Sequence, residues 1–153
     1  MKVDAVLDGE IVVLDEYGRS QFNDLLFRRG ILYFYAFDLL SLNGEDMRAL
    51  PLIKRKARLR KLIGRGKWRL RYVDHIEQQG CEFFQRICEL DLEGIVAKRA
   101  YSIYRVTDQP SRDWIKIKNP NYSQKEGRAE LFDELQSRVT AKAALGSANG
   151  GKV

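Results

Sequence analysis

The alternation of apolar and polar residues along the chain predicts a mixture of short strands and helices. Residues 5–14 are rich in β-branched side chains, and their apolar positions alternate with Asp8 and Glu10, as in a strand with one buried face. Residues 31–40 are almost entirely apolar and aromatic, which is typical of a strand at the centre of a sheet. Both segments therefore predict a sheet in the first third of the chain.

Turn and capping residues divide the rest of the chain into further elements. The Asn43-Gly44 pair predicts a turn. Pro51 suits the first turn of a basic amphipathic helix, which Gly64 or Gly66 ends. The expected helices cover residues 21–29, 51–63, 79–90 and 124–138, and the further expected strands cover residues 68–73, 94–99 and 113–118. In the helix over 79–90, Phe83, Ile87 and Leu90 are expected to face inward.

The order of these elements indicates the fold class and the domain organisation. Strands and helices are mixed without regular βαβ alternation, so we expect an α+β fold with largely antiparallel sheets. Residues 1–138 are expected to form one domain. Residues 139–153 are rich in Ala, Gly, Ser and Lys, too small and too polar to pack, and are expected to be a flexible tail.

The charge distribution points to an anionic partner. The net charge is +6 with a pI near 9.4, and ten Lys or Arg residues but no acid lie between Lys54 and Arg71. Such a run suits a phosphate backbone, whose binding is driven by counterion release; the alternative is a solvated helix face without a partner. The candidate DNA contacts are Lys54, Arg55, Arg58, Lys61, Arg65 and Lys67.

Several functional classes are not supported by the sequence. Cys81 and Cys88 lie about two turns apart in an expected helix, too far for a disulfide, and with one histidine, His75, a zinc site is not expected. The chain has no Gly-x-x-x-x-Gly-Lys-Ser/Thr, Gly-x-Gly-x-x-Gly or Gly-x-Ser-x-Gly pattern. No apolar run approaches the ~20 residues that span a bilayer, and no signal peptide is recognisable. We therefore expect a cytoplasmic protein without a membrane partner.

Four short segments carry the candidate chemistry, and their order is more specific than any one of them. They are LDGEIV at residues 7–12, YAFDLL at 35–40, EGIVAK at 93–98 and WIKIK at 114–118. In order and approximate spacing they resemble motifs III, IIIa, IV and V of the ATP-dependent DNA ligase family, over residues 5–132. The chain also resembles the bacterial type related to ligase D, in which an ending like residues 119–128 follows the last motif.

The resemblance implies roles for five residues. Lys116 and Lys118 would contact the α-phosphate of the nucleotide; strand alternation places both on one face with Trp114, although an edge strand with exposed lysines has the same pattern. Phe37 would stack on adenine, Glu10 would hold the ribose side, and Glu93 would help to bind a catalytic divalent cation. ATP and Mg²⁺ are thus the implied cofactors, and nicked duplex DNA is the implied substrate.

One motif of the resembled family is missing from the sequence. Its AMP-carrying lysine lies in a Lys-x-Asp-Gly motif well upstream of the Asp-Gly-Glu strand, whereas seven residues precede Asp8 here and Lys2-Val3-Asp4-Ala5 has alanine for glycine. The resemblance also implies a C-terminal oligonucleotide-binding domain, which is not present. We therefore expect a partial domain that cannot adenylate itself: a shortened gene product, a fragment, or a half that pairs with another chain supplying the motif. The alternatives are a non-catalytic DNA-binding remnant and a nucleotidyltransferase of the RNA ligase or capping type.

Overall fold

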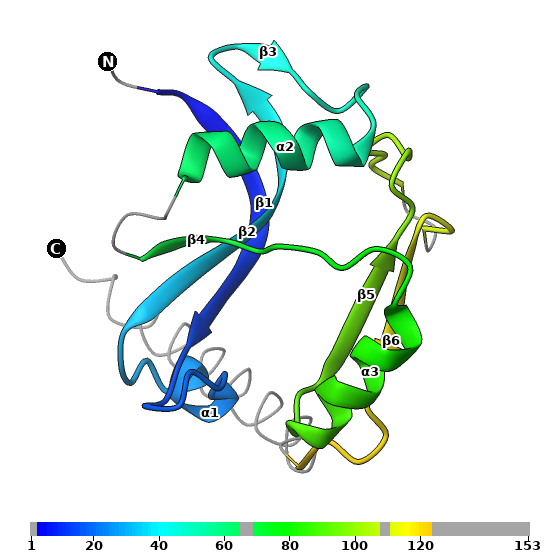
Figure 1. The fold of residues 1–153 in the computed structure, drawn as a ribbon. Coiled ribbons are helices and arrows are strands. Elements are labelled where there is room, and N and C mark those ends of the chain that lie inside the picture. Colours follow the sequence, from blue (N-terminus) through cyan, green and yellow to red (C-terminus); the bar gives the residue numbers. More distant parts are fainter. Residues whose placement is uncertain (1–2, 65–68, 108–110, 124–153) are drawn as a thin grey trace, which may run out of the picture.

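The computed structural model describes residues 3–64, 69–107 and 111–123 of the chain, and these residues form two separate sheets with three helices (Figure 1). The first sheet is built on the long antiparallel pair of β1 (Ala5–Val13) and β2 (Leu32–Leu42). The second is the antiparallel pair of β5 (Gly94–Lys98) and β6 (Trp114–Lys118). The expected α+β class with largely antiparallel sheets is confirmed.

Two short strands complete the first sheet. Strand β3 (Glu45–Asp46) returns antiparallel to β2 through Asn43 and Gly44, which both have positive φ as the predicted turn requires. Strand β4 (Leu70–Tyr72) instead runs parallel to β2. This parallel pairing follows from the connection, because α2 crosses over the sheet before the chain enters β4 (Figure 1).

Helix α2 (Leu52–Ile63) supplies the main core contact of the first sheet. Its residues Leu52, Leu59 and Ile63 are buried, and Leu59 and Ile63 pack with Ala36 and Leu39 of β2 in one cluster. Pro51 precedes the first helical turn and Gly64, with φ of 60°, ends the helix. The boundaries and the apolar stripe of this helix are as the sequence predicts.

The two other described helices differ from the sequence prediction. Helix α1 (Phe22–Leu26) is shorter than the expected 21–29 and has no side-chain cap. Helix α3 (Gly80–Glu89) lies against β5, as expected for 79–90, but only Ile87 of its apolar residues is buried. Phe83 and Leu90 are 36% and 42% exposed, so the expectation that both face inward is wrong. Among the described elements, α3 has its main contacts with β5 of the narrow two-stranded sheet, which is too small to cover the whole apolar side of the helix. The expected helix over 124–138 and the expected tail over 139–153 lie outside the described residues.

Candidate functional site

A β-bulge in β2 gives Phe37 its position at the candidate site. Asp8 of β1 pairs with Asp38 and the next residue, Gly9, pairs with Ala36, so Phe37 is an extra residue without a partner in β1. Bulges of this kind re-aim a side chain and are common beside functional sites. The strands also approach closely here, because a Cβ at Gly9 would lie 2.6 Å from both a ring atom of Phe34 and the carbonyl oxygen of Tyr35. Glycine in the Asp-Gly-Glu segment is therefore a packing requirement.

Three aromatic side chains and one lysine join the two sheets at Phe37. The Lys98 ammonium of β5 lies 3.8 Å from the ring centroid of Phe37 and 3.7 Å from that of Trp114 in β6. The Phe37 and Trp114 rings meet edge to face at 6.5 Å, and Tyr104 meets Trp114 edge to face at 5.4 Å. The site thus lies between the sheets, and its contacts are cation–π and aromatic.

The Lys98 ammonium is in an unusual environment for a charged group. Its Nζ is buried and donates no hydrogen bond within the described part of the chain. Burial lowers the pKa of Lys98 to about 8, although the carboxylates of Asp38 and Asp8 partly oppose this shift. A buried donor without an acceptor marks a place where an anionic or polar ligand would be stabilised.

The residues behind this cluster are held by charge-assisted hydrogen bonds. Asp38 and Arg55 are both fully buried and form a two-point ion pair, with Nε–Oδ1 and Nη2–Oδ2 distances of 2.7 and 2.8 Å. Arg55 also donates from Nη1 to the carbonyl oxygens of Leu50 and Ser102. The pair therefore fixes β2, α2 and the loop after β5 relative to one another.

Lys116 and Lys118 lie on the face of β6 that carries Trp114. In the β5–β6 register Lys98 pairs with Trp114, Val96 with Lys116, and Gly94 with Lys118. Since Trp114 and Lys98 contact Phe37, strand alternation turns both exposed lysines toward the same side of the second sheet. The opposite face, with Ile95, Ala97 and Ile117, lines a groove against α3.

The two candidate glutamates lie at the edges of this arrangement. Glu93 is exposed and precedes β5, so the strand alternation that determines the direction of the Lys98 side chain does not apply to it. The Glu93 carbonyl oxygen accepts a hydrogen bond at 2.8 Å from the amide of Asn119, the residue directly after Lys118. Glu10 is exposed in β1, opposite Tyr35. No group of three or more His, Cys, Asp or Glu residues suited to a metal occurs in the described ranges.

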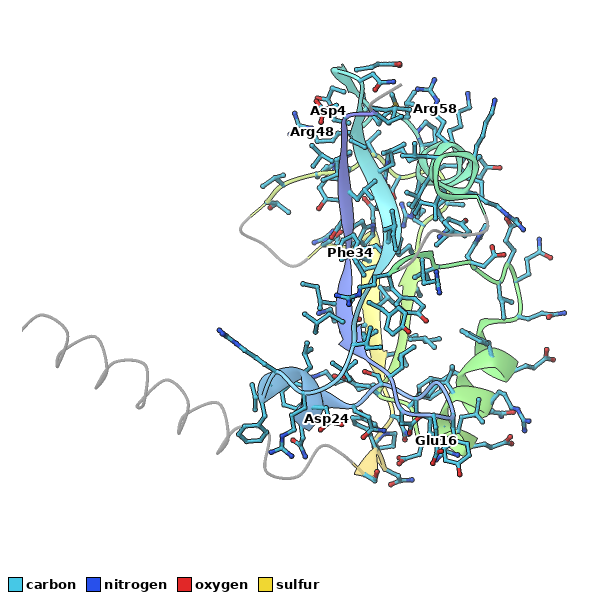
Figure 2. All side chains as sticks on the ribbon, turned by 90° about the vertical axis from the view of Figure 1, so that its left-hand side faces the viewer. Asp4, Glu16, Asp24, Phe34, Arg48 and Arg58 are labelled. Carbon is cyan, nitrogen blue, oxygen red and sulfur yellow. The ribbon has the colours of Figure 1, made fainter. Side chains whose placement is uncertain are left out.

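The candidate DNA contacts divide into three groups. Lys54, Arg58 and Lys61 are exposed on α2. Figure 2 places Arg58, like Arg48, at the end of the first sheet where Asp4 leads into β1, while Glu16 and Asp24 lie at the opposite end. The prediction of Arg55 as a DNA contact is wrong: its guanidinium has no exposed area and is paired with Asp38, so it is not available to DNA. Arg65 and Lys67 lie outside the described residues.

Sequence reasoning missed most of the side chains that surround Phe37. The sequence assigns no role to Asp38, Lys98, Tyr104 or Trp114, and the bulge at Phe37 has no sequence signature. A usable signal existed only for Arg55, which lies three residues after Leu52 and four before Leu59, on the buried stripe of α2.

Comparison with known proteins gives this site a context. Residues 1–118 match the family model of the ATP dependent DNA ligase domain. The multifunctional non-homologous end joining protein LigD of Pseudomonas aeruginosa is 43% identical over 119 residues, which are 73% of this chain and 14% of that protein. The SPbeta prophage-derived DNA ligase-like protein LigB of Bacillus subtilis is 30% identical, over 78% of this chain and 46% of its own length.

Solved structures agree with the sequence relatives. The ligase domain of M. tuberculosis LigD has a TM-score of 0.66 at 30% identity, over 76% of this chain and 38% of that structure. A mycobacterial DNA ligase D complexed with ATP and MES also has a TM-score of 0.66, at 31% identity. The chain thus spans less than half the length of these relatives. No described helix is long and apolar enough to cross a membrane. By the match over residues 1–118 and by these relatives, the chain belongs to the ATP-dependent DNA ligase domain family.

Proposed function

We propose that this chain forms part of a DNA ligase catalytic domain that binds ATP between its two sheets, passes AMP to a DNA 5′-phosphate and seals nicks in duplex DNA during repair. The observation that carries the proposal is the position of Phe37 beside the lysine-bearing face of β6, with Trp114 between them. A base stacked on Phe37 would direct its phosphates toward Lys116 and Lys118. The mycobacterial relative complexed with ATP supports this choice of nucleotide.

Each candidate residue has a role that suits its position. Lys98 lies over one face of the Phe37 ring, and the opposite face is the one that we assign to stacking on the base. Glu10, exposed on β1, accepts hydrogen bonds from ribose hydroxyls. Lys116 and Lys118 are exposed ammonium groups two residues apart on one strand face, a spacing that suits one phosphate group. These are positioning and charge-stabilising contacts of the kind that accelerates phosphoryl transfer.

Glu93 is the residue that we assign to Mg²⁺. Magnesium commonly binds one or two carboxylates together with substrate phosphates, so a preformed cage of protein ligands is not required. Glu93 is exposed and lies at the end of the second sheet where Lys118 is found. When bound, the ion would neutralise charge on the phosphates.

The chain itself is not expected to carry the covalent AMP. No Lys-x-Asp-Gly occurs in its 153 residues, so the proposed transfer needs a second polypeptide or segment that supplies this lysine. Nucleotide binding and covalent labelling can therefore be separated in an experiment.

The test combines equilibrium binding with labelling. With ATP and Mg²⁺, the wild-type chain should bind nucleotide, and Lys116→Ala, Lys118→Ala and Phe37→Ala should each weaken binding at least about tenfold, since each removes a direct contact. α-Labelled ATP should leave no label on the denatured protein. Arg86→Ala, on the outer side of α3, is the matched control for lost charge. Wild-type affinity in both lysine variants would refute the assignment of β6, and stable label would refute the proposed lack of self-adenylation.

A second candidate function is DNA binding without nucleotide. The exposed basic residues of α2, Lys54, Arg58 and Lys61, favour it. Salt-sensitive binding of nicked DNA by a chain that binds no ATP would support this candidate over the first. Preference for a nick in RNA over a nick in DNA would instead favour the RNA ligase or capping type.

A further inference from the structure

Tyr104 connects the two sheets through both ends of its side chain. Its hydroxyl donates a hydrogen bond to Oδ2 of Asp8 in β1, at 3.0 Å. Its ring meets Trp114 of β6 edge to face, with ring centroids 5.4 Å apart. The two sheets share no strand pairing in the described part of the chain, so contacts outside the strand ladders, this side chain among them, hold them together.

The backbone around Tyr104 is fixed to the first sheet and its helix. The Tyr104 amide donates to the carbonyl oxygen of Arg48 at 2.8 Å. Two residues earlier, the carbonyl oxygen of Ser102 accepts hydrogen bonds from the Leu52 amide and from the buried Arg55 guanidinium. Arg55 also lies 5.8 Å from the Tyr104 ring centroid. The ring is thus presented to Trp114 from a rigid support.

The two strands that Tyr104 connects carry different parts of the proposed nucleotide site. Asp8 is two residues from Glu10 in β1 and pairs with Asp38, the neighbour of Phe37. Trp114 is on the same face of β6 as Lys116 and Lys118. One wall would therefore hold the base and the ribose, and the other would hold the phosphate.

We propose that Tyr104 is a positioning residue of the nucleotide site, which sets the distance between the base-binding and phosphate-binding walls through its hydrogen bond to Asp8. The inference rests on the proposed nucleotide binding. A ligand that contacts both walls gains affinity only when their separation matches its length, whereas a fragment that contacts one wall is indifferent to it. Tyr104 itself need not touch the ligand.

The fragments of AMP test this directly. In Tyr104→Phe, which keeps the ring against Trp114, AMP affinity should fall about tenfold, the loss of one hydrogen bond to a charged group. Adenosine and inorganic phosphate, each titrated alone and followed by NMR, should bind within about twofold of wild type. Asp8→Ala should give the same loss for AMP, and the double variant should lose no more than either single variant. Tyr101→Phe removes a hydroxyl from a side chain that is 79% exposed and is the matched control.

The outcomes separate this inference from the function on which it rests. Wild-type protein that binds no AMP would overturn both. AMP binding that Lys116→Ala abolishes but Tyr104→Phe leaves unchanged would overturn the role of Tyr104 alone. An equal loss of AMP, adenosine and phosphate, or a loss that follows a drop in thermal stability, would mean that the hydroxyl supports folding and does not position the two walls.

Discussion

Asp38 and Arg55 form a bidentate ion pair with no exposed area on either side chain. The pair joins β2, the central strand of the first sheet, to α2, the helix that covers it. The Arg55 guanidinium also donates a hydrogen bond to the carbonyl oxygen of Ser102, in the loop that carries Tyr104. Removal of two charges from water is costly, and only good geometry and further hydrogen bonds offset that cost. Asp38 also accepts a hydrogen bond from the Leu39 amide, so both partners are well satisfied.

The first prediction concerns this pair. Arg55→Met should lower the free energy of unfolding by about 3–5 kcal/mol, because it leaves the Asp38 carboxylate buried without its partner. Urea denaturation measures the change. The double variant Asp38→Leu/Arg55→Met, which buries no charge, should recover much of the loss. A cost below about 1 kcal/mol for Arg55→Met would contradict the buried pair, and the exposed Arg86→Met should cost no more than that.

The sequence predicted the elements better than it predicted the role of individual charges. Strand alternation and the apolar stripe of α2 depend on local periodicity, so β1, β2 and α2 were expected close to their observed bounds. Arg55 was grouped with its basic neighbours because charge alone does not indicate burial. Its acidic partner is 17 residues earlier in the chain, and only the fold brings the two together.

The candidate site was predictable only as far as its motifs. Phe37, Lys116 and Lys118 follow from short segments that resemble the family. The contact of Lys98 with both aromatic rings instead depends on how two sheets meet that share no strand pairing in the described residues. The bulge at Phe37 depends on a register shift between β1 and β2, which the composition of neither strand encodes. The geometry between elements was therefore outside the reach of sequence patterns.

The second prediction concerns Gly94, the glycine of the Glu-Gly segment. Its φ is 149°, and a Cβ there would collide with the carbonyl oxygen of Ile117 and lie 2.9 Å from Cα of Lys118. Gly94→Ala should therefore destabilise the protein by about 2 kcal/mol or more, by strain and by displacement of β6. Gly80→Ala is the matched control, because nothing lies within 4 Å of a Cβ at this helix N-terminus. If Gly94→Ala unfolds at the same temperature as Gly80→Ala or at a higher one, the close approach of β5 and β6 is contradicted.

The third prediction concerns the pH dependence of stability. Burial lowers the pKa of Lys98 from 10.5 to about 8, so between these values the unfolded chain binds more protons than the folded chain. The free energy of unfolding therefore rises with pH across this window. Below about pH 8 the full cost of burying the charged Lys98 ammonium is present. Lys98→Met should have a higher free energy of unfolding than wild type, and this difference should shrink between about pH 7.5 and about pH 9.5. Urea denaturation of both proteins at several pH values measures it. A difference that stays constant or grows with pH would show that the Lys98 ammonium is not desolvated.

The fourth prediction concerns the exposed face of α2, which we propose as the DNA contact. Lys54→Gln, Arg58→Gln and Lys61→Gln should each weaken binding of nicked duplex DNA, and each should reduce the slope of log K against log salt by about 0.9 for a lost phosphate contact. Their effects should be independent of DNA sequence, because phosphate contacts position the protein and do not read bases. Fluorescence anisotropy at several salt concentrations measures both quantities.

The control for this face must remove the same charge without touching α2. Arg86→Gln does so, since Arg86 is exposed on α3 and paired with Glu89 at 2.6 Å. If binding depends on net charge alone, Arg86→Gln will reduce affinity as much as the α2 variants do, and α2 is then not a docking surface. If α2 is the docking surface, the slope of log K against log salt will change for the α2 variants and will not change for Arg86→Gln. Arg55 is unsuitable for this comparison, because its guanidinium is buried and its loss would destabilise the packing of α2 on the sheet.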